Sequence, residues 1–142
     1  MKFPKAHIEG AQYDFSFSGL KSAVLNYING CKMKGESFDP ADIAASFQKA
    51  VVEVLVENSM RAAEDYGVYK FAIAGGVASN TALREAMEQA CKEREIRFYR
   101  PSPIYCTDNA AMIGAAAYYE YLAGTRHGWD LNAVPNLKLG ER

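Results

Sequence analysis

The chain has 142 residues, of which 49% are hydrophobic and 23% charged, and its formal net charge is −1. This is the composition of one globular domain, and it excludes a strongly basic, stand-alone nucleic-acid binder. No stretch reaches the roughly 18 continuous apolar residues of a membrane span. Residues 1–10 also lack the apolar run of a signal peptide. We therefore expect a cytoplasmic protein without a membrane partner.

The first elements are expected to be a short strand and a helix. Alternating aromatic and polar residues predict the strand over Tyr13–Phe17. Ser16 or Ser18 is expected to cap a helix that carries apolar residues as far as Ile28. Gly30 is expected to end that helix.

The second predicted helix has the clearest start in the chain. Asp39 is a good N-cap residue, and Pro40 suits the first helical position. Apolar residues then recur at helical spacing as far as about Tyr66. Gly67 is expected to follow as a left-handed C-cap.

Two strands and another helix are predicted next. The apolar run Tyr69–Ala74 is typical of a strand in a parallel sheet that is covered on both faces. Ser79 or Asn80 is expected to cap the following helix, and Ile96–Tyr99 reads as a second strand.

The last predicted helix begins after an extended loop that contains Pro101 and Pro103. Thr107 is expected to cap this helix, which would run from Asp108 to about Leu122. We expect residues 1–124 to form one lobe and residues 125–142 to form an irregular tail.

These elements predict an α/β fold with few parallel strands and flanking helices. A covered parallel sheet usually has more strands than are visible here. The chain is therefore expected to be part of a fold, with sheet edges that another surface should cover. If they stay uncovered, the short sheet and the alanine-rich last helix favour self-association.

The first candidate site is the turn Gly75–Asn80, between a predicted strand and a predicted helix. Gly75 and Gly76 would let a ligand approach the backbone, and a helix N-terminus attracts phosphate. Asn80 could cap the helix or bind a ribose or a base. A tight turn without a ligand is the alternative.

The second candidate is Asp108, which could stabilise the first turn of a helix or serve as an oxygen ligand of a metal. Lys21 could reach phosphate, although a solvated lysine on an amphipathic helix is the simpler interpretation. Cys106 could have a lowered pKa, but no histidine is near it in sequence. His7 and His127 read as loop residues without a special role.

Four stretches, in this order, closely resemble the C-terminal half of the tRNA N6-adenosine threonylcarbamoyltransferase family, formerly called O-sialoglycoprotein endopeptidase or glycoprotease. The resemblance runs from about Phe3 to about Leu122. The stretches are FSFSGLKSAV, DIAASFQKAVVEVL, AGGVASNTALR and PIYCTDNAAMIG.

The resemblance implies one lobe of a two-lobed fold of the actin, hexokinase and Hsp70 type (a ribonuclease H-like lobe). It also implies transfer of threonylcarbamoyl from threonylcarbamoyl-AMP to the adenine 3′ of a tRNA anticodon, with other subunits of a threonylcarbamoylation complex as partners. Gly75 and Gly76 then match the glycine pair that lines the site for the adenylate or ATP. Asn80 matches the asparagine that binds adenosine, and Asp108 matches a ligand of iron or zinc.

One part of the family pattern is absent. The family's other metal ligands form an H-x-x-x-H motif, whereas the histidines here are His7 and His127. Because one carboxylate cannot hold a transition metal tightly, we expect this chain to be inactive alone. Two alternatives are a glycoprotease-type metallopeptidase and a non-catalytic nucleotide-binding scaffold. No metalloprotease H-E-x-x-H motif supports the first, and the retained Gly75, Gly76, Asn80 and Asp108 count against the second.

Overall fold

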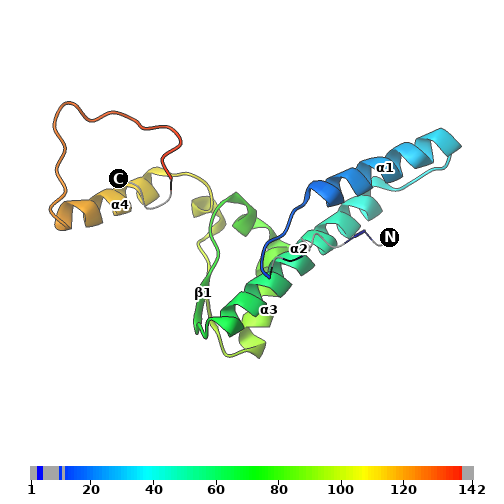
Figure 1. Cartoon of the computed structure of the whole chain (residues 1–142), viewed down its shortest axis with the longest axis horizontal. Helices are drawn as coiled ribbons and strands as arrows, with labels where there is room; N and C mark the ends of the chain where they lie inside the picture. The colour runs from blue at the N-terminus through cyan, green and yellow to red at the C-terminus, as the bar shows by residue number, and fades with distance from the viewer. Residues whose placement is uncertain (1–2, 5–9, 11, 139–142) are drawn as a thin grey trace. The chain divides into compact units, whose positions relative to one another are not determined.

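A computed structural model of the chain describes residues 3–4, 10 and 12–138 (Figure 1). The chain divides into two compact units, Met1–Thr107 and Asp108–Arg142, and each is described by itself. The first unit contains the helices α1, α2 and α3, the strands β1 and β2, and two short 3₁₀ turns. The second unit contains the helix α4. The boundary expected between residues 124 and 125 stays a prediction.

The first helix, α1 (Ser18–Lys34), is longer than expected. The prediction that Gly30 ends it is wrong, because the helix continues for one more turn. It ends at Gly35, where a left-handed backbone (φ 69°) lets the N–H bond to carbonyls of the last turn. Neither predicted serine is the N-cap residue, which is Phe17. The predicted strand over Tyr13–Phe17 is reduced to an isolated bridge at Phe15.

The second helix, α2 (Pro40–Asp65), begins as predicted. The Oδ1 atom of Asp39 accepts a hydrogen bond from the backbone N–H of Ala41 at 2.8 Å, and Pro40 takes the first helical position. The helix ends at Asp65. Gly67 follows in the left-handed region, with φ 61°.

The sheet has two parallel strands, β1 (Lys70–Ala72) and β2 (Arg97–Tyr99), with Phe71 opposite Phe98. The helix α3 (Thr81–Glu93) connects them. Both strands are shorter than predicted. The prediction of a sheet covered on both faces is wrong for the described chain. In each strand the central residue is half-buried and the two outer residues are exposed. The loop after β2 contains a 3₁₀ turn, Pro103–Tyr105, in place of the predicted extended segment.

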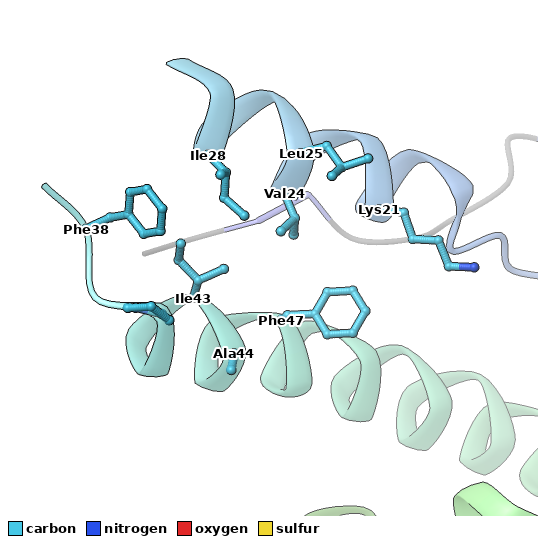
Figure 2. Close-up of a pocket in the computed structure, with 9 residues that line it drawn as sticks. Lys21, Val24, Leu25, Ile28, Phe38, Ile43, Ala44 and Phe47 are labelled. Carbon is cyan, nitrogen blue, oxygen red and sulfur yellow. The ribbon is translucent and has the colours of Figure 1, made fainter. Parts of the chain in front are cut away.

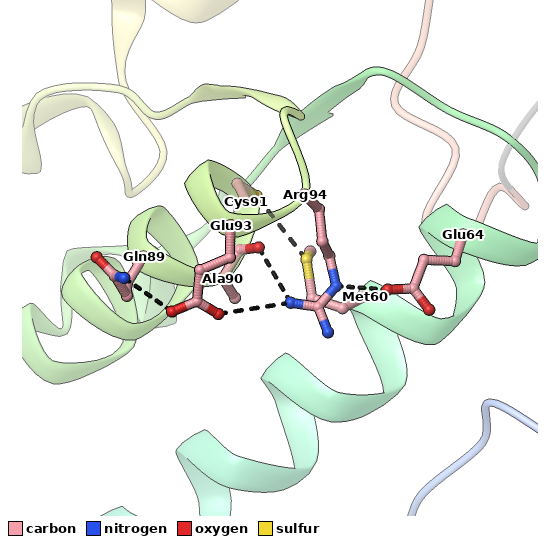
Figure 3. Close-up of polar contacts among 7 residues, drawn as sticks. All are labelled: Met60, Glu64, Gln89, Ala90, Cys91, Glu93 and Arg94. Carbon is pink, nitrogen blue, oxygen red and sulfur yellow. Dashed lines mark hydrogen bonds and ion pairs between the residues drawn. The ribbon is translucent and has the colours of Figure 1, made fainter.

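The core of the first unit lies where α2 and α3 pack together beneath the two strands. Its buried residues are Met60, Ala63, Leu83, Met87, Ala90, Cys91 and Ile96. At the edge of this core, the Arg94 guanidinium donates to the Glu64 carboxylate of α2 and to the carbonyl of Ala90 (Figure 3). The Sγ atom of Cys91 lies 4.0 Å from the Sδ atom of Met60. Packing at the C-terminal end of α2 therefore fixes the position of α3.

The N-terminal half of α2 lies beside α1, and the two helices leave an apolar groove between them (Figure 2). The groove has a volume of about 480 Å³. Lys21 of α1 lies at one end of it, beyond Phe47 of α2. This position agrees with the amphipathic-helix interpretation of Lys21. The groove's other lining residues are Val24, Leu25, Ile28, Phe38, Pro40, Ile43 and Ala44.

In the second unit, α4 (Ala110–Leu122) begins two residues later than predicted. The prediction that Thr107 caps this helix is wrong. The N-cap residue is Asn109, whose Oδ1 atom accepts from the backbone N–H of Met112 at 2.9 Å. After the helix, Arg126 stacks on the ring of Tyr121 at 3.9 Å and donates to its carbonyl. None of the residues in α4 is buried.

Among the residues that the structure describes, no helix has the length and apolarity needed to cross a membrane. The three cysteines are Cys31, Cys91 and Cys106, and each is buried and free.

Candidate functional site

The turn Gly75–Asn80 follows the carboxyl end of β1 and leads into α3. Gly75 has φ 84° and ψ 172°, a backbone conformation that is essentially restricted to glycine. The 3₁₀ turn Gly76–Ser79 comes next, and the Oγ atom of Ser79 donates to the carbonyl of Gly76 at 2.6 Å. A Cβ atom added at Gly75 would meet nothing within 4 Å. The chain therefore requires glycine here for its backbone conformation and leaves the space around it open.

Asn80, one of the two residues expected to cap α3, is its N-cap residue. Its Oδ1 atom accepts from the backbone N–H of Leu83 at 2.9 Å. Its Nδ2 atom donates to the Oε1 atom of Gln48, on α2, at 3.0 Å. Gln48 was not among the predicted site residues. Because it is 32 positions from Asn80, no local sequence pattern connects the two.

Two hollows flank this turn within the first unit. The first, of about 270 Å³, lies between α2 and the turn, and Gln48, Val77 and Asn80 are among the residues that line it. The second, of about 560 Å³, lies between the start of α3 and the loop after β2. It is lined by Arg84, whose side chain donates to the carbonyl of Pro101. Because β1 and β2 are parallel, both segments leave the same edge of the sheet, where α/β folds bind their ligands.

The structure brings Gly75, Gly76 and Asn80 together in one turn, whereas Asp108 belongs to the second unit. Asp108 precedes the N-cap residue of α4, and the first turn of that helix contains no acidic residue. The prediction that Asp108 lies inside the helix is wrong, and its role, as a stabiliser of the helix end or as a metal ligand, stays a prediction. Within residues 3–4, 10 and 12–138, no three His, Cys, Asp or Glu side chains are grouped so that they could hold a metal. These residues do not by themselves fit a complete metal centre.

The remaining candidates are Cys106 and the two histidines, and none of them lies in the glycine turn. Cys106 is buried, and its Sγ atom lies 3.6 Å from the carbonyl oxygen of Ser102. His127 lies in an irregular segment, as predicted. His7 lies outside the described residues.

The family model for tRNA N6-adenosine threonylcarbamoyltransferase matches residues 1–115. The chain belongs to this family. A relative of that name from Clostridium botulinum (strain Hall) is 58% identical over 142 residues, which are all of this chain and 42% of the relative. Another, from Clostridium novyi (strain NT), is 62% identical over 141 residues, 99% of this chain and 41% of the relative.

This family member therefore spans about two fifths of the length of the relatives that it matches. The matched region includes β1, the glycine turn, α3 and Asp108, and it ends within α4. The α/β architecture with two parallel strands and flanking helices agrees with the predicted fold class.

Proposed function

We propose that this chain is the C-terminal, nucleotide-binding portion of an enzyme that transfers threonylcarbamoyl from threonylcarbamoyl-AMP to a tRNA. The acceptor is the exocyclic amine of the adenine 3′ of the anticodon, and AMP leaves. The observation that carries this proposal is the glycine turn Gly75–Asn80 at the carboxyl end of a parallel strand, in a chain whose residues 1–115 match the family model. Substrate binding at this edge is the general rule for α/β folds.

Each predicted site residue has a role in the proposal. Gly75 and Gly76 let the adenylate approach the backbone, and the N-terminus of α3 favours its phosphate. Asn80 binds the adenosine part. Asp108 supplies one ligand to iron or zinc, and the other ligands come from outside this chain. The protein partners are the other subunits of the threonylcarbamoylation complex.

The chain alone is expected to be inactive, because one carboxylate does not hold a transition metal tightly. The test is transfer of labelled threonylcarbamoyl from threonylcarbamoyl-AMP to unmodified tRNA, with Fe²⁺ or Zn²⁺ supplied. Three samples are compared: this chain, this chain mixed with the remaining part of the Clostridium novyi relative, and a chimera. In the chimera, this chain replaces the 141 matching residues of that relative. Cell extract depleted of its own transferase supplies partner subunits, and the unaltered relative sets the full rate.

We expect transfer by the mixture and by the chimera, and none by the chain alone. In the chimera, Asp108→Ala should lower transfer by about 100-fold and lower the bound metal, because loss of a residue that only orients a metal ligand already costs about 10–100-fold. Asp130→Ala, which removes another carboxylate of the second unit, is the matched control. Transfer by the chain alone would show that it needs no other part. A folded but inactive chimera would overturn the proposal.

Two finer points stay predictions. One is that this α/β unit is part of an actin, hexokinase and Hsp70-type lobe. The other is that the chain associates with itself through the short sheet and α4, where the side chains of Ile113, Tyr119 and Leu122 are each more than 60% exposed. A monomer by light scattering at high protein concentration would rule out the second.

A further inference from the structure

The side chain of Asn80 is held from two sides. Within its own helix, its Oδ1 atom accepts from the backbone N–H of Leu83 at 2.9 Å. Across the first unit, its Nδ2 atom donates to the Oε1 atom of Gln48 at 3.0 Å. The partners in both bonds lie on α2 and α3, which are held in place because the two helices pack together in the core. The carboxamide of Asn80 therefore has a defined orientation.

The two bonds also decide which hydrogen-bonding groups remain for a ligand. A carboxamide has two N–H donors and one carbonyl acceptor. Rotating the Asn80 amide by half a turn would place its Nδ2 donor against the N–H donor of Leu83, so the cap selects one orientation. Gln48 accepts one of the two N–H groups. The second N–H of Nδ2 is left to donate to a ligand.

The surroundings of Gln48 point to a binding role. Nine residues line the hollow of about 270 Å³ between α2 and the turn, and only Gln48 and Asn80 among them have polar side chains. Ligand sites typically combine a mostly apolar wall with a few placed polar groups. Gln48 itself is exposed, so the core does not require its carboxamide. The seven apolar lining residues are Ala44, Phe47, Val51, Val52, Leu55, Val77 and Leu83.

We propose that Gln48 is a positioning residue, which acts through Asn80 by holding its carboxamide in the orientation that donates to the nucleotide. This role rests on the proposed function, in which Asn80 binds the adenosine part of threonylcarbamoyl-AMP. Gln48 deepens that function, because it extends the nucleotide site from the glycine turn to α2.

The experiment measures kcat and KM for threonylcarbamoyl-AMP in the chimera with Gln48→Leu, which removes the acceptor. We expect KM to rise about fivefold with kcat unchanged. The lost hydrogen bond orients a group that binds the substrate equally in the ground state and in the transition state. Gln48→Glu keeps an oxygen acceptor. At 0.15 M salt, where charges are screened beyond about 8 Å, it should bring KM to within about twofold of the wild-type value.

The matched control is Gln89→Leu, which is the same substitution on α3. It removes an exposed hydrogen bond from Gln89 Nε2 to Glu93 Oε1, 2.8 Å long, and should leave KM unchanged. Thermal unfolding of all variants separates a loss of folding from a loss of binding. An active wild-type chimera whose KM is unaffected by Gln48→Leu would overturn the role of Gln48 alone. An equal rise in KM for Gln48→Glu would overturn it too. An inactive wild-type chimera would overturn the proposed function, and this role with it.

Discussion

An asparagine caps α3 and α4 in the same way, yet the two helices differ in how many of their residues are buried. Asn80 and Asn109 each accept a hydrogen bond from the backbone N–H three residues later, and both bonds are 2.9 Å long. After its cap, α3 buries four residues, whereas α4 buries none. A cap depends only on neighbouring residues, but burial depends on what other elements bring to the helix. Local sequence is therefore enough to form a helix cap, whereas burial of a helix also requires other elements that pack on it.

Composition explains part of this difference. One face of α3 is apolar and the other carries Arg84, Glu85 and Glu88, as expected for a helix at the surface of a core. In contrast, α4 has a single charged residue, Glu120, and its apolar side chains point in all directions. Helices of this kind are normally buried. The sequence of α4 is therefore suited to being covered by other protein surface.

The largest effect is expected from replacing a methionine by alanine, once on α3 and once on α4. Met87 on α3 is 2% exposed, and Met112 on α4 is 47% exposed. Met87→Ala should lower the free energy of unfolding by about 2–5 kcal/mol, the cost of a cavity in a packed core. Met112→Ala should lower it by less than about 0.5 kcal/mol, as at other surface positions. Urea unfolding followed by circular dichroism measures both. Equal losses would contradict the difference between the helices.

The next effect concerns the two glycines of the candidate site. Gly75→Ala should cost about 1–3 kcal/mol, because its backbone conformation is strained for any residue with a Cβ atom. Gly76→Ala should change stability by less than about 0.5 kcal/mol, because the added Cβ atom would lie at an ordinary 3.8 Å from Cγ2 of Thr107. The same unfolding assay compares the two variants.

The glycine pair also distinguishes a bare turn from a nucleotide site. In the chimera, Gly76→Ala should still raise KM for threonylcarbamoyl-AMP, because the methyl group occupies space that the ligand needs. A stable Gly76→Ala chimera with normal KM would favour the interpretation of this segment as a tight turn without a ligand.

The two caps should have similar and smaller effects. Asn80→Ala and Asn109→Ala should each destabilise their helix by about 1 kcal/mol, because one backbone N–H loses its acceptor. Hydrogen exchange measured by NMR should become faster at the amide of Leu83 in the first variant and at Met112 in the second. Asn80→Asp should restore the protection of Leu83, because it keeps the acceptor oxygen. Unchanged exchange at either amide would mean that the cap does not form in solution.

The smallest effect is a dependence on alkaline pH that belongs to α3. Burial raises the pKa of the Cys91 thiol above its ordinary value of 9.0. The folded protein therefore holds this proton more tightly than the unfolded chain does. The resulting stability is complete below pH 9 and is lost as the pH rises through the raised pKa. We expect a loss of less than about 1 kcal/mol between pH 8.5 and pH 9.5.

Urea unfolding across that range, repeated with Cys91→Ala, measures this contribution. The variant should be less stable at pH 8.5 but should lose less stability as the pH rises. Tyr13→Phe is the control, because the hydrogen bond from Tyr13 to Asp65 raises the pKa of the tyrosine and acts in the same direction at higher pH. An identical pH dependence of wild type and Cys91→Ala would contradict the assignment.

Features that depend on neighbouring residues were predictable from the sequence. Asp39, Pro40 and Gly67 mark the ends of α2 as expected, because capping is a local property. Asn80 was one of two expected caps for the same reason. Local rules failed where two residues competed. Gly30 resembles a helix end, but a helix interior tolerates glycine at a cost of about 1 kcal/mol, and the better stop is Gly35.

Features that depend on distant residues were not predictable. The apolar run Tyr69–Ala74 reads as a buried strand, but burial requires covering elements, and the described chain supplies too few. The bond from Asn80 to Gln48 joins two helices and has no local pattern. Thr107 and Asn109 are both good caps on composition, and the backbone conformation decides between them.

The order of elements in the core has a consequence for how the chain folds. The packed elements α2, β1, α3 and β2 all lie within residues 40–99, although α2 packs on α3 across β1, and β1 pairs with β2 across a 3₁₀ turn and α3. Parallel pairing of two strands separated by a helix requires loop closure, so it forms more slowly than contacts within a single helix. A ribosome that has released residue 99 has already supplied the whole α2–α3 core. This core can therefore form during synthesis, before α4 leaves the ribosome.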